Sequence, residues 1–159
     1  MTKAPRKDPR LPLIDILEAI EHIETDTANM DEAAFALDRR ARQLVERNVE
    51  IISEASRRVP DELKSAEPDI PWREIAGIGN MLRHDYDGVR PEILWNMRVN
   101  RLEPLKQAVG RLLDREQAKN RKRGRDQRAR DLIKTAGPEK AHCNPPSPGD
   151  PDQVRPHRR

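Results

Sequence analysis

LIDILEAIEHI, residues 13–23, has the spacing of an amphipathic helix. Its aliphatic side chains recur three or four residues apart and so share one stripe: Leu13, Ile16, Leu17, Ile20 and Ile23. The glutamates of this region fall off the stripe, as residues that face solvent should. The pattern predicts a helix from about residue 9 to residue 27 that buries one of its faces.

A second, longer helix is predicted after this one. Residues 31–59 contain neither Gly nor Pro, and Pro60 then ends the run, so we expect one unbroken helix there. Its inner face is predicted to consist of apolar residues: Leu37, Ala41, Leu44, Val45, Ile52 and Ala55.

Prolines mark the start of the last two predicted helices. Pro71 stands where its fixed φ suits the first helical position. The residues that follow it at helical spacing share one face: Trp72, Ile75, Gly79, Leu82 and Tyr86. Asp87-Gly88 is a turn signal, after which Pro91 opens the fourth helix. We expect Pro104 to kink or restart that helix, because proline lacks a backbone donor.

Composition favours the same fold class. Aromatic residues make up only 3% of the chain and charged residues 37%, which suits helices with aliphatic stripes better than a β-sandwich. Four or five helices with short connectors predict an all-α fold, an antiparallel bundle. A bundle this small leaves apolar surface to cover, so we also expect a homodimer.

The positive charge of the chain is concentrated at its C-terminal end. Residues 114–159 hold 13 Lys or Arg against 7 Asp or Glu, although the net charge of the whole chain is only +3. Residues 138–159 contain six prolines and few apolar groups, a composition typical of disorder. We therefore predict a helical domain over residues 9–113, a basic helical extension over 114–135 and a disordered proline-rich tail over 136–159.

Membrane proteins and metal enzymes are disfavoured by the sequence. No apolar run approaches the roughly 20 residues of a membrane span, and no secretory segment follows the charged N-terminus. We therefore expect a cytoplasmic protein with no membrane partner. Cys143 is the only cysteine, and none of the four histidines has a second ligand at the spacing of a known metal motif. We expect neither a metal site nor a cofactor.

The segment Arg83-His84-Asp85-Tyr86 carries the groups most suited to chemistry. An imidazole such as that of His84 can act as an acid or a base near neutral pH. The guanidinium of Arg83 can hold a phosphate, and the phenol of Tyr86 can be modified covalently. A phosphate contact beside a proton carrier suits RNA cleavage, in which the 2′-hydroxyl loses a proton and the leaving oxygen gains one.

Two residues on preceding turns could support this segment. Asn80 lies one helical turn before His84 and could orient its ring, and Arg73 lies three turns before it on nearly the same face. A purely structural interpretation stays open as well. Tyr86 continues the apolar stripe, and His84 could cap the helix C-terminus, where a cation is favoured. Gly79 could likewise mark only close packing of helices.

Two longer segments carry more information than these single residues. One is Ile70-Pro71-Trp72-Arg73-Glu74-Ile75-Ala76-Gly77, and it continues through spaced positions: Asn80, Leu82, His84, Tyr86, Gly88 and Val89. The other is Val45-Glu46-Arg47-Asn48-Val49-Glu50-Ile51-Ile52-Ser53-Glu54-Ala55. Together, in this order, they resemble the HepT-like proteins, bacterial toxins of the HEPN superfamily. The resemblance covers roughly the first two-thirds of the chain.

This resemblance implies an α-helical bundle that dimerises and cleaves RNA without a metal ion. The family's hallmark is an Arg, four to six residues, a His, one residue and a Tyr, and its last two members carry over to His84 and Tyr86. The chain would then be the toxin of a type VII-like toxin–antitoxin pair. Its partner would be a minimal nucleotidyltransferase antitoxin, which inhibits the endoribonuclease by transferring AMP onto Tyr86.

The chain departs from this pattern at the motif arginine. That residue would fall at Gly79, and neither Gly77 nor Ile78 supplies it. A glycine cannot stabilise the negative charge that develops in the transition state. Two interpretations follow. Either Arg83 replaces the arginine from a different direction, or the chain is a catalytically weak or inactive HepT-like binding module that serves as the partner of a nucleotidyltransferase.

The basic extension is also open to two interpretations. Its cations could contact an RNA or DNA backbone: Lys119, Arg121, Lys122, Arg123, Arg125, Arg128 and Arg130. The alternative is a solvated extension that only raises solubility. No aromatic residue lies among these cations, which argues against sequence-specific recognition of single strands.

Overall fold

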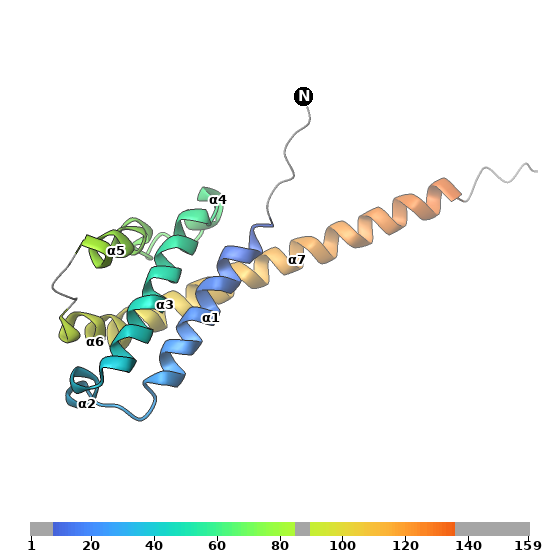
Figure 1. Cartoon of the computed structure of the whole chain (residues 1–159). Coiled ribbons are helices and arrows are strands. Elements are labelled where there is room, and N and C mark those ends of the chain that lie inside the picture. Colours follow the sequence, from blue (N-terminus) through green and yellow to red (C-terminus); the bar gives the residue numbers. More distant parts are fainter. Residues whose placement is uncertain (1–7, 85–89, 136–159) are drawn as a thin grey trace, which may run out of the picture. The chain divides into compact units, whose positions relative to one another are not determined.

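The computed structural model describes residues 8–84 and 90–135, and over these residues it contains seven helices and no strand (Figure 1). The predicted all-α fold is confirmed. The helices are α1 (Arg10–Asp26), α2 (Glu32–Leu37), α3 (Arg39–Arg58), α4 (Asp61–Lys64), α5 (Trp72–His84), α6 (Pro91–Asn100) and α7 (Leu102–Thr135). The chain divides into a compact unit that ends at Arg123 and a second unit that begins at Gly124.

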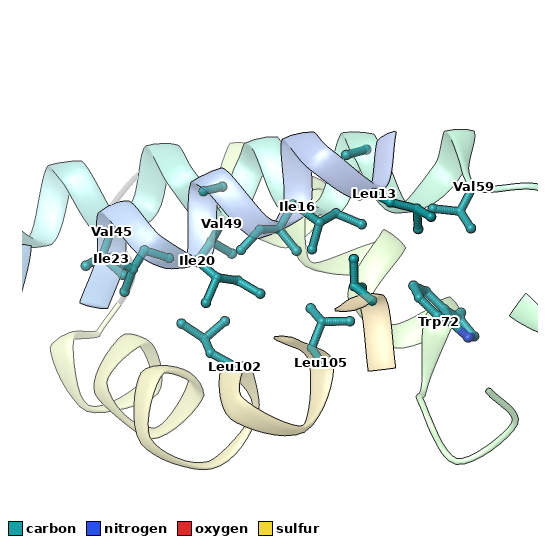
Figure 2. Close-up of a cluster of buried hydrophobic side chains, with 14 of the residues drawn as sticks. Leu13, Ile16, Ile20, Ile23, Val45, Val49, Val59, Trp72, Leu102 and Leu105 are labelled. Carbon is teal, nitrogen blue, oxygen red and sulfur yellow. The ribbon is translucent and has the colours of Figure 1, made fainter. Parts of the chain in front are cut away.

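The core of the first unit lies where α1, α3 and the start of α7 meet. α1 and α3 run antiparallel along each other (Figure 1). Figure 2 shows side chains that meet between them: Leu13, Ile16, Ile20 and Ile23 of α1, Val45 and Val49 of α3, and Leu102 and Leu105 of α7. Each fully buried Leu or Ile contributes about 1.5–3 kcal/mol to folding. The helix predicted from the aliphatic stripe of residues 13–23 is thereby confirmed.

The predicted single helix over residues 31–59 is wrong, because Asp38 divides it into α2 and α3. The backbone of Asp38 is extended, with φ −89° and ψ 96°, so no helix passes through it. Its Oδ1 accepts hydrogen bonds from the backbone N–H groups of Arg40 and Ala41, at 2.9 and 3.0 Å. Asp38 is thus the N-cap of α3, a position where a short carboxylate satisfies otherwise unpaired donors.

Two residues predicted to lie on the inner face of that helix are exposed. Leu37 is 88% exposed, because the break at Asp38 ends the register that would have turned it inward. Leu44 is 47% exposed, since it lies about 100° around α3 from the buried Val45. Phe35 provides the apolar contact of α2 instead and is only 1% exposed.

Pro104 was predicted to kink or restart the fourth helix, and the structure shows a restart. α6 ends at Asn100 and α7 begins at Leu102, so Pro104 lies in the first turn, where its missing N–H breaks no helical hydrogen bond. The described residues therefore contain more helices than the four or five predicted. Asp38 and Arg101 each divide a predicted helix. The short α4 lies between Pro60 and Pro71, where no helix was predicted.

α7 carries the basic extension. Every residue from Ala118 to Thr135 is exposed, and the residues from Gly124 onward belong to the second unit. No helix in the described ranges is both long and apolar enough to cross a membrane. The tail predicted to be disordered, residues 136–159, lies outside the described residues.

Candidate functional site

The site predicted from sequence depends on α5, and the start of α5 is fastened to α7 through Glu67. Trp72 opens α5 and is almost fully buried, and its Nε1 donates a hydrogen bond to the Glu67 carbonyl at 3.1 Å. The Glu67 carboxylate accepts two hydrogen bonds from Arg111 of α7, at 3.0 and 2.6 Å. This paired geometry fixes the start of α5, the helix whose other end carries the predicted site.

We expect the Glu67–Arg111 pair to make folding depend on pH. The hydrogen bond from Arg111 holds the pKa of Glu67 below its usual range. A carboxyl whose pKa is lowered in the folded state stabilises the protein above its unfolded-state pKa, and this stabilisation is lost as the pH falls through the folded-state pKa. Melting temperatures from pH 7 down to pH 3 should therefore decline less steeply in Glu67→Gln than in the wild type.

The matched control for this prediction is Glu62→Gln. Glu62 is an exposed residue of α4, so its variant should keep the acid decline of the wild type. Equal slopes for the wild type and Glu67→Gln would show that the pair contributes nothing to the pH dependence.

The middle of α5 packs against α3 through Ser53. The Ser53 hydroxyl donates a hydrogen bond to the Ala76 carbonyl at 2.9 Å and accepts one from the Gly79 N–H at 3.1 Å. Both Ser53 and Gly79 are buried. The position where the family motif places its arginine is therefore packed directly on α3.

One turn further along α3, Arg57 reaches over the surface of α5. Its Nε and Nη2 donate to the Ala76 carbonyl at 3.2 and 2.7 Å, and Nη2 also donates to Asn80 Oδ1 at 3.1 Å. Its Nη1 pairs with Glu54 Oε2 at 3.1 Å. The Arg57 side chain is still 33% exposed, so its guanidinium is fixed against α5 and remains in reach of solvent.

Only part of the predicted site lies within the described residues. Asn80 is on the exposed surface of α5, where it meets Arg57, and Arg73 is exposed in the first turn, about 10 Å away along the helix axis. The α5 backbone continues to His84, one turn beyond Asn80. The side chains of Arg83 and His84 and the whole of Tyr86 lie outside the described part of the chain.

Arg57 is absent from the site predicted from sequence. Arg57 and Asn80 are 23 residues apart, and no local pattern indicates that they meet. The available signal was weak: Ser53 and Arg57 are polar residues one helical turn apart, next to the apolar stripe of α3. Their shared partner, the Ala76 carbonyl, becomes evident only once α3 and α5 are packed together.

A cavity of about 710 Å³ lies elsewhere, between α5, α6 and the start of α7. Much of its lining is apolar: Ile70, Ile75, Ile78, Ile93, Met97 and Leu105. Glu74 and Arg101 also line it, with Arg101 Nη1 3.9 Å from Glu74 Oε2. Neither Asn80 nor Arg57 lines this cavity.

Metal ligands do not gather in the part of the chain that the structure describes. Over residues 8–84 and 90–135, no three His, Cys, Asp or Glu side chains lie close enough together to hold a metal ion.

The family described as ribonuclease HepT-like matches residues 16–112, from the buried stripe of α1 to the buried part of α7. The chain belongs to this HepT-like family. The matched range includes Ser53, Arg57 and all of α5. The segment resemblance recognised in the sequence is therefore confirmed at the level of the family.

Relatives of the HepT-like chain carry ribonuclease names. "Probable ribonuclease HepT" of Thermococcus cleftensis is 43% identical over 83 residues, which cover 52% of this chain and 76% of that protein. "Putative RNase MJ0127" of Methanocaldococcus jannaschii is 34% identical over 98 residues, or 62% and 81% of the two chains. "Putative RNase TTE0752" of Caldanaerobacter subterraneus is 31% identical over 110 residues, or 69% and 98%. No solved structure matches the chain significantly.

Proposed function

We propose that this HepT-like chain is a metal-independent endoribonuclease and the toxin of a type VII-like toxin–antitoxin pair. It acts as a homodimer on RNA, with His84 as general acid and base and Arg83 as a phosphate contact. Tyr86 accepts AMP from a minimal nucleotidyltransferase antitoxin, which inhibits cleavage. The observation that carries the proposal is the family match over residues 16–112, which includes these three positions.

The chemistry needs only proton transfer and stabilisation of charge. The 2′-oxygen bonds to the adjacent phosphorus as its proton passes to a base, and the bond from phosphorus to the 5′-oxygen breaks as that oxygen takes a proton. The products are a 2′,3′-cyclic phosphate and a 5′-hydroxyl. A guanidinium that contacts the phosphate stabilises the charge on the non-bridging oxygens. Asn80, one turn before His84, helps to orient the imidazole.

Cleavage is tested with purified full-length protein on tRNA and mRNA. We expect fragments with the ends named above, formed equally well with and without EDTA, and slower growth of cells that express the protein without its partner. The ribonuclease function is refuted if the RNA stays intact and if cells that express His84→Ala grow at the same rate as cells that express the wild type.

AMP transfer is tested separately. Incubation with ATP and a minimal nucleotidyltransferase that binds this protein should add one AMP to the wild type, seen by mass spectrometry, and should stop cleavage. Tyr86→Phe should remain unmodified and stay active in the presence of the antitoxin. An AMP found on another residue would reject the assignment to Tyr86.

A binding module without nuclease activity is the second candidate, and Gly79 favours it. The motif arginine is absent there, and the Gly79 N–H is bonded to Ser53. Gly79 is buried against Ser53 of α3, so an arginine at this position needs room there. The informative variant is therefore Gly79→Arg combined with Ser53→Ala, which removes the hydroxyl. The wild type would be an inactive binding module if it co-purifies with a nucleotidyltransferase and does not cleave RNA, while the double variant does cleave it.

We expect the basic extension to strengthen RNA binding. Its exposed cations allow counterions to be released from the RNA backbone, a contribution that salt weakens. Deleting residues 115–159 should weaken RNA binding in fluorescence anisotropy at low salt, and the difference should shrink as salt is raised. Unchanged affinity at low salt would leave the extension a role in solubility only.

A further inference from the structure

Arg57 lies beside the place where the motif arginine is missing. We propose that Arg57, from α3, supplies a second guanidinium, in addition to that of Arg83, that contacts the RNA phosphate next to His84. This inference rests on the proposed ribonuclease function and identifies a residue outside the family motif. It explains how a chain with Gly79 can still bring a fixed positive charge to the reacting phosphate.

The contacts of Arg57 place its charge on the correct face of α5. Ala76 and Asn80, which Arg57 bonds, lie one turn apart, and the His84 position follows Asn80 by one more turn, about 6 Å along the axis. A guanidinium bonded to Asn80 therefore lies beside the same helical stripe as His84. A residue on a neighbouring helix replaces one that the motif would place on α5 itself.

The two arginines predicted from sequence occupy other positions on α5. Arg73 is three turns before His84, about 16 Å along the axis, which is too far for both to contact one phosphate. Arg83 is adjacent to His84 in sequence, so its position lies about 100° around the helix. Arg57 is bonded to Asn80, one turn before the His84 position.

The Arg57 guanidinium is held in a fixed orientation and can still bind a phosphate. Its hydrogen bonds to Ala76 and Asn80 fix the plane of the guanidinium, which reduces the ordering that a phosphate contact would require. The remaining bond, to Glu54, involves a carboxylate side chain that is 58% exposed. Such an exposed pair exchanges readily, so a phosphate oxygen can take the place of the Glu54 carboxylate.

The experiment compares Arg57→Ala and Arg57→Lys with Arg47→Ala in the full-length protein. Arg47 is on the same helix and pairs with Glu50 at 3.1 Å, as Arg57 pairs with Glu54, but it lies about 15 Å away along the axis. Cleavage is measured on a single-stranded RNA. Binding is measured on the same sequence with 2′-O-methyl groups, which cannot be cleaved, at a series of salt concentrations.

We expect Arg57→Ala to lower the cleavage rate about 10²–10³-fold. The slope of log affinity against log salt for the 2′-O-methyl RNA should fall by about 0.7, the value for one lost phosphate contact on a single strand. Arg57→Lys should keep the slope and recover only part of the rate, because it keeps the charge and loses the planar fork. Arg47→Ala should cleave within about twofold of the wild type.

The outcomes separate this inference from the proposed function. If the wild type cleaves and Arg57→Ala cleaves equally well, the inference is overturned and the function stands. If the wild type does not cleave, the nuclease is refuted, and the salt slope still decides whether Arg57 contacts RNA phosphate: an unchanged slope overturns the contact. If circular dichroism shows that Arg57→Ala does not fold, the cleavage rate and the salt slope are measured on Arg57→Gln instead, which keeps a donor for the Ala76 carbonyl.

Discussion

Replacing His84 with alanine is expected to lower RNA cleavage by about 10²–10⁴-fold, the usual contribution of a positioned acid or base. The methyl group cannot take the proton of the 2′-hydroxyl or return one to the leaving oxygen. Binding of the 2′-O-methyl RNA should change little, because the proposed role of His84 is to transfer protons rather than to hold the phosphate. The rate under single-turnover conditions measures the effect.

His22→Ala is the matched control for this experiment. His22 is an exposed histidine of α1, so its loss should leave cleavage and growth unaffected. Cells that express His84→Ala without an antitoxin should grow as well as cells without the protein. Cleavage retained in His84→Ala at the rate of His22→Ala would remove His84 from the mechanism.

Replacing Phe35 with alanine is expected to lower the free energy of unfolding by about 3–5 kcal/mol. Phe35 is 1% exposed, and its ring centroid is 5.3 Å from that of Trp95 in α6. The Arg98 guanidinium lies 4.9 Å from the Trp95 ring centroid. Truncating Phe35 therefore opens a cavity beneath α6 and removes the only buried residue of α2. Urea denaturation followed by circular dichroism measures the loss.

Leu37→Ala tests the same short helix from its exposed side. Leu37 is 88% exposed, so its truncation should change stability by no more than about 0.5 kcal/mol. The sequence pattern had placed Leu37 on the inner face, and the pair of variants therefore distinguishes the two registers of α2. A larger loss of unfolding free energy for Leu37→Ala than for Phe35→Ala would support the unbroken helix predicted over residues 31–59.

The helical class, the buried face of α1 and the family could be predicted because their signals are local. The apolar spacing of α1, the proline before α5 and the spaced residues around His84 all lie within single segments, and each can be recognised without knowing what packs against it. The helix break at Asp38 is local as well, but the sequence is ambiguous there. A run without Gly or Pro permits a helix through Asp38, whereas its carboxylate stabilises the start of a new one.

The helical class, the stripe that α1 buries and the family therefore follow from the sequence alone. Periodicity and motif order depend on neighbours along the chain, which the sequence contains directly. Tertiary structure alone decided which arginine meets Asn80. Arg57 and Asn80 come together because α3 and α5 pack through Ser53, and a contact across 23 residues depends on that packing rather than on any local preference.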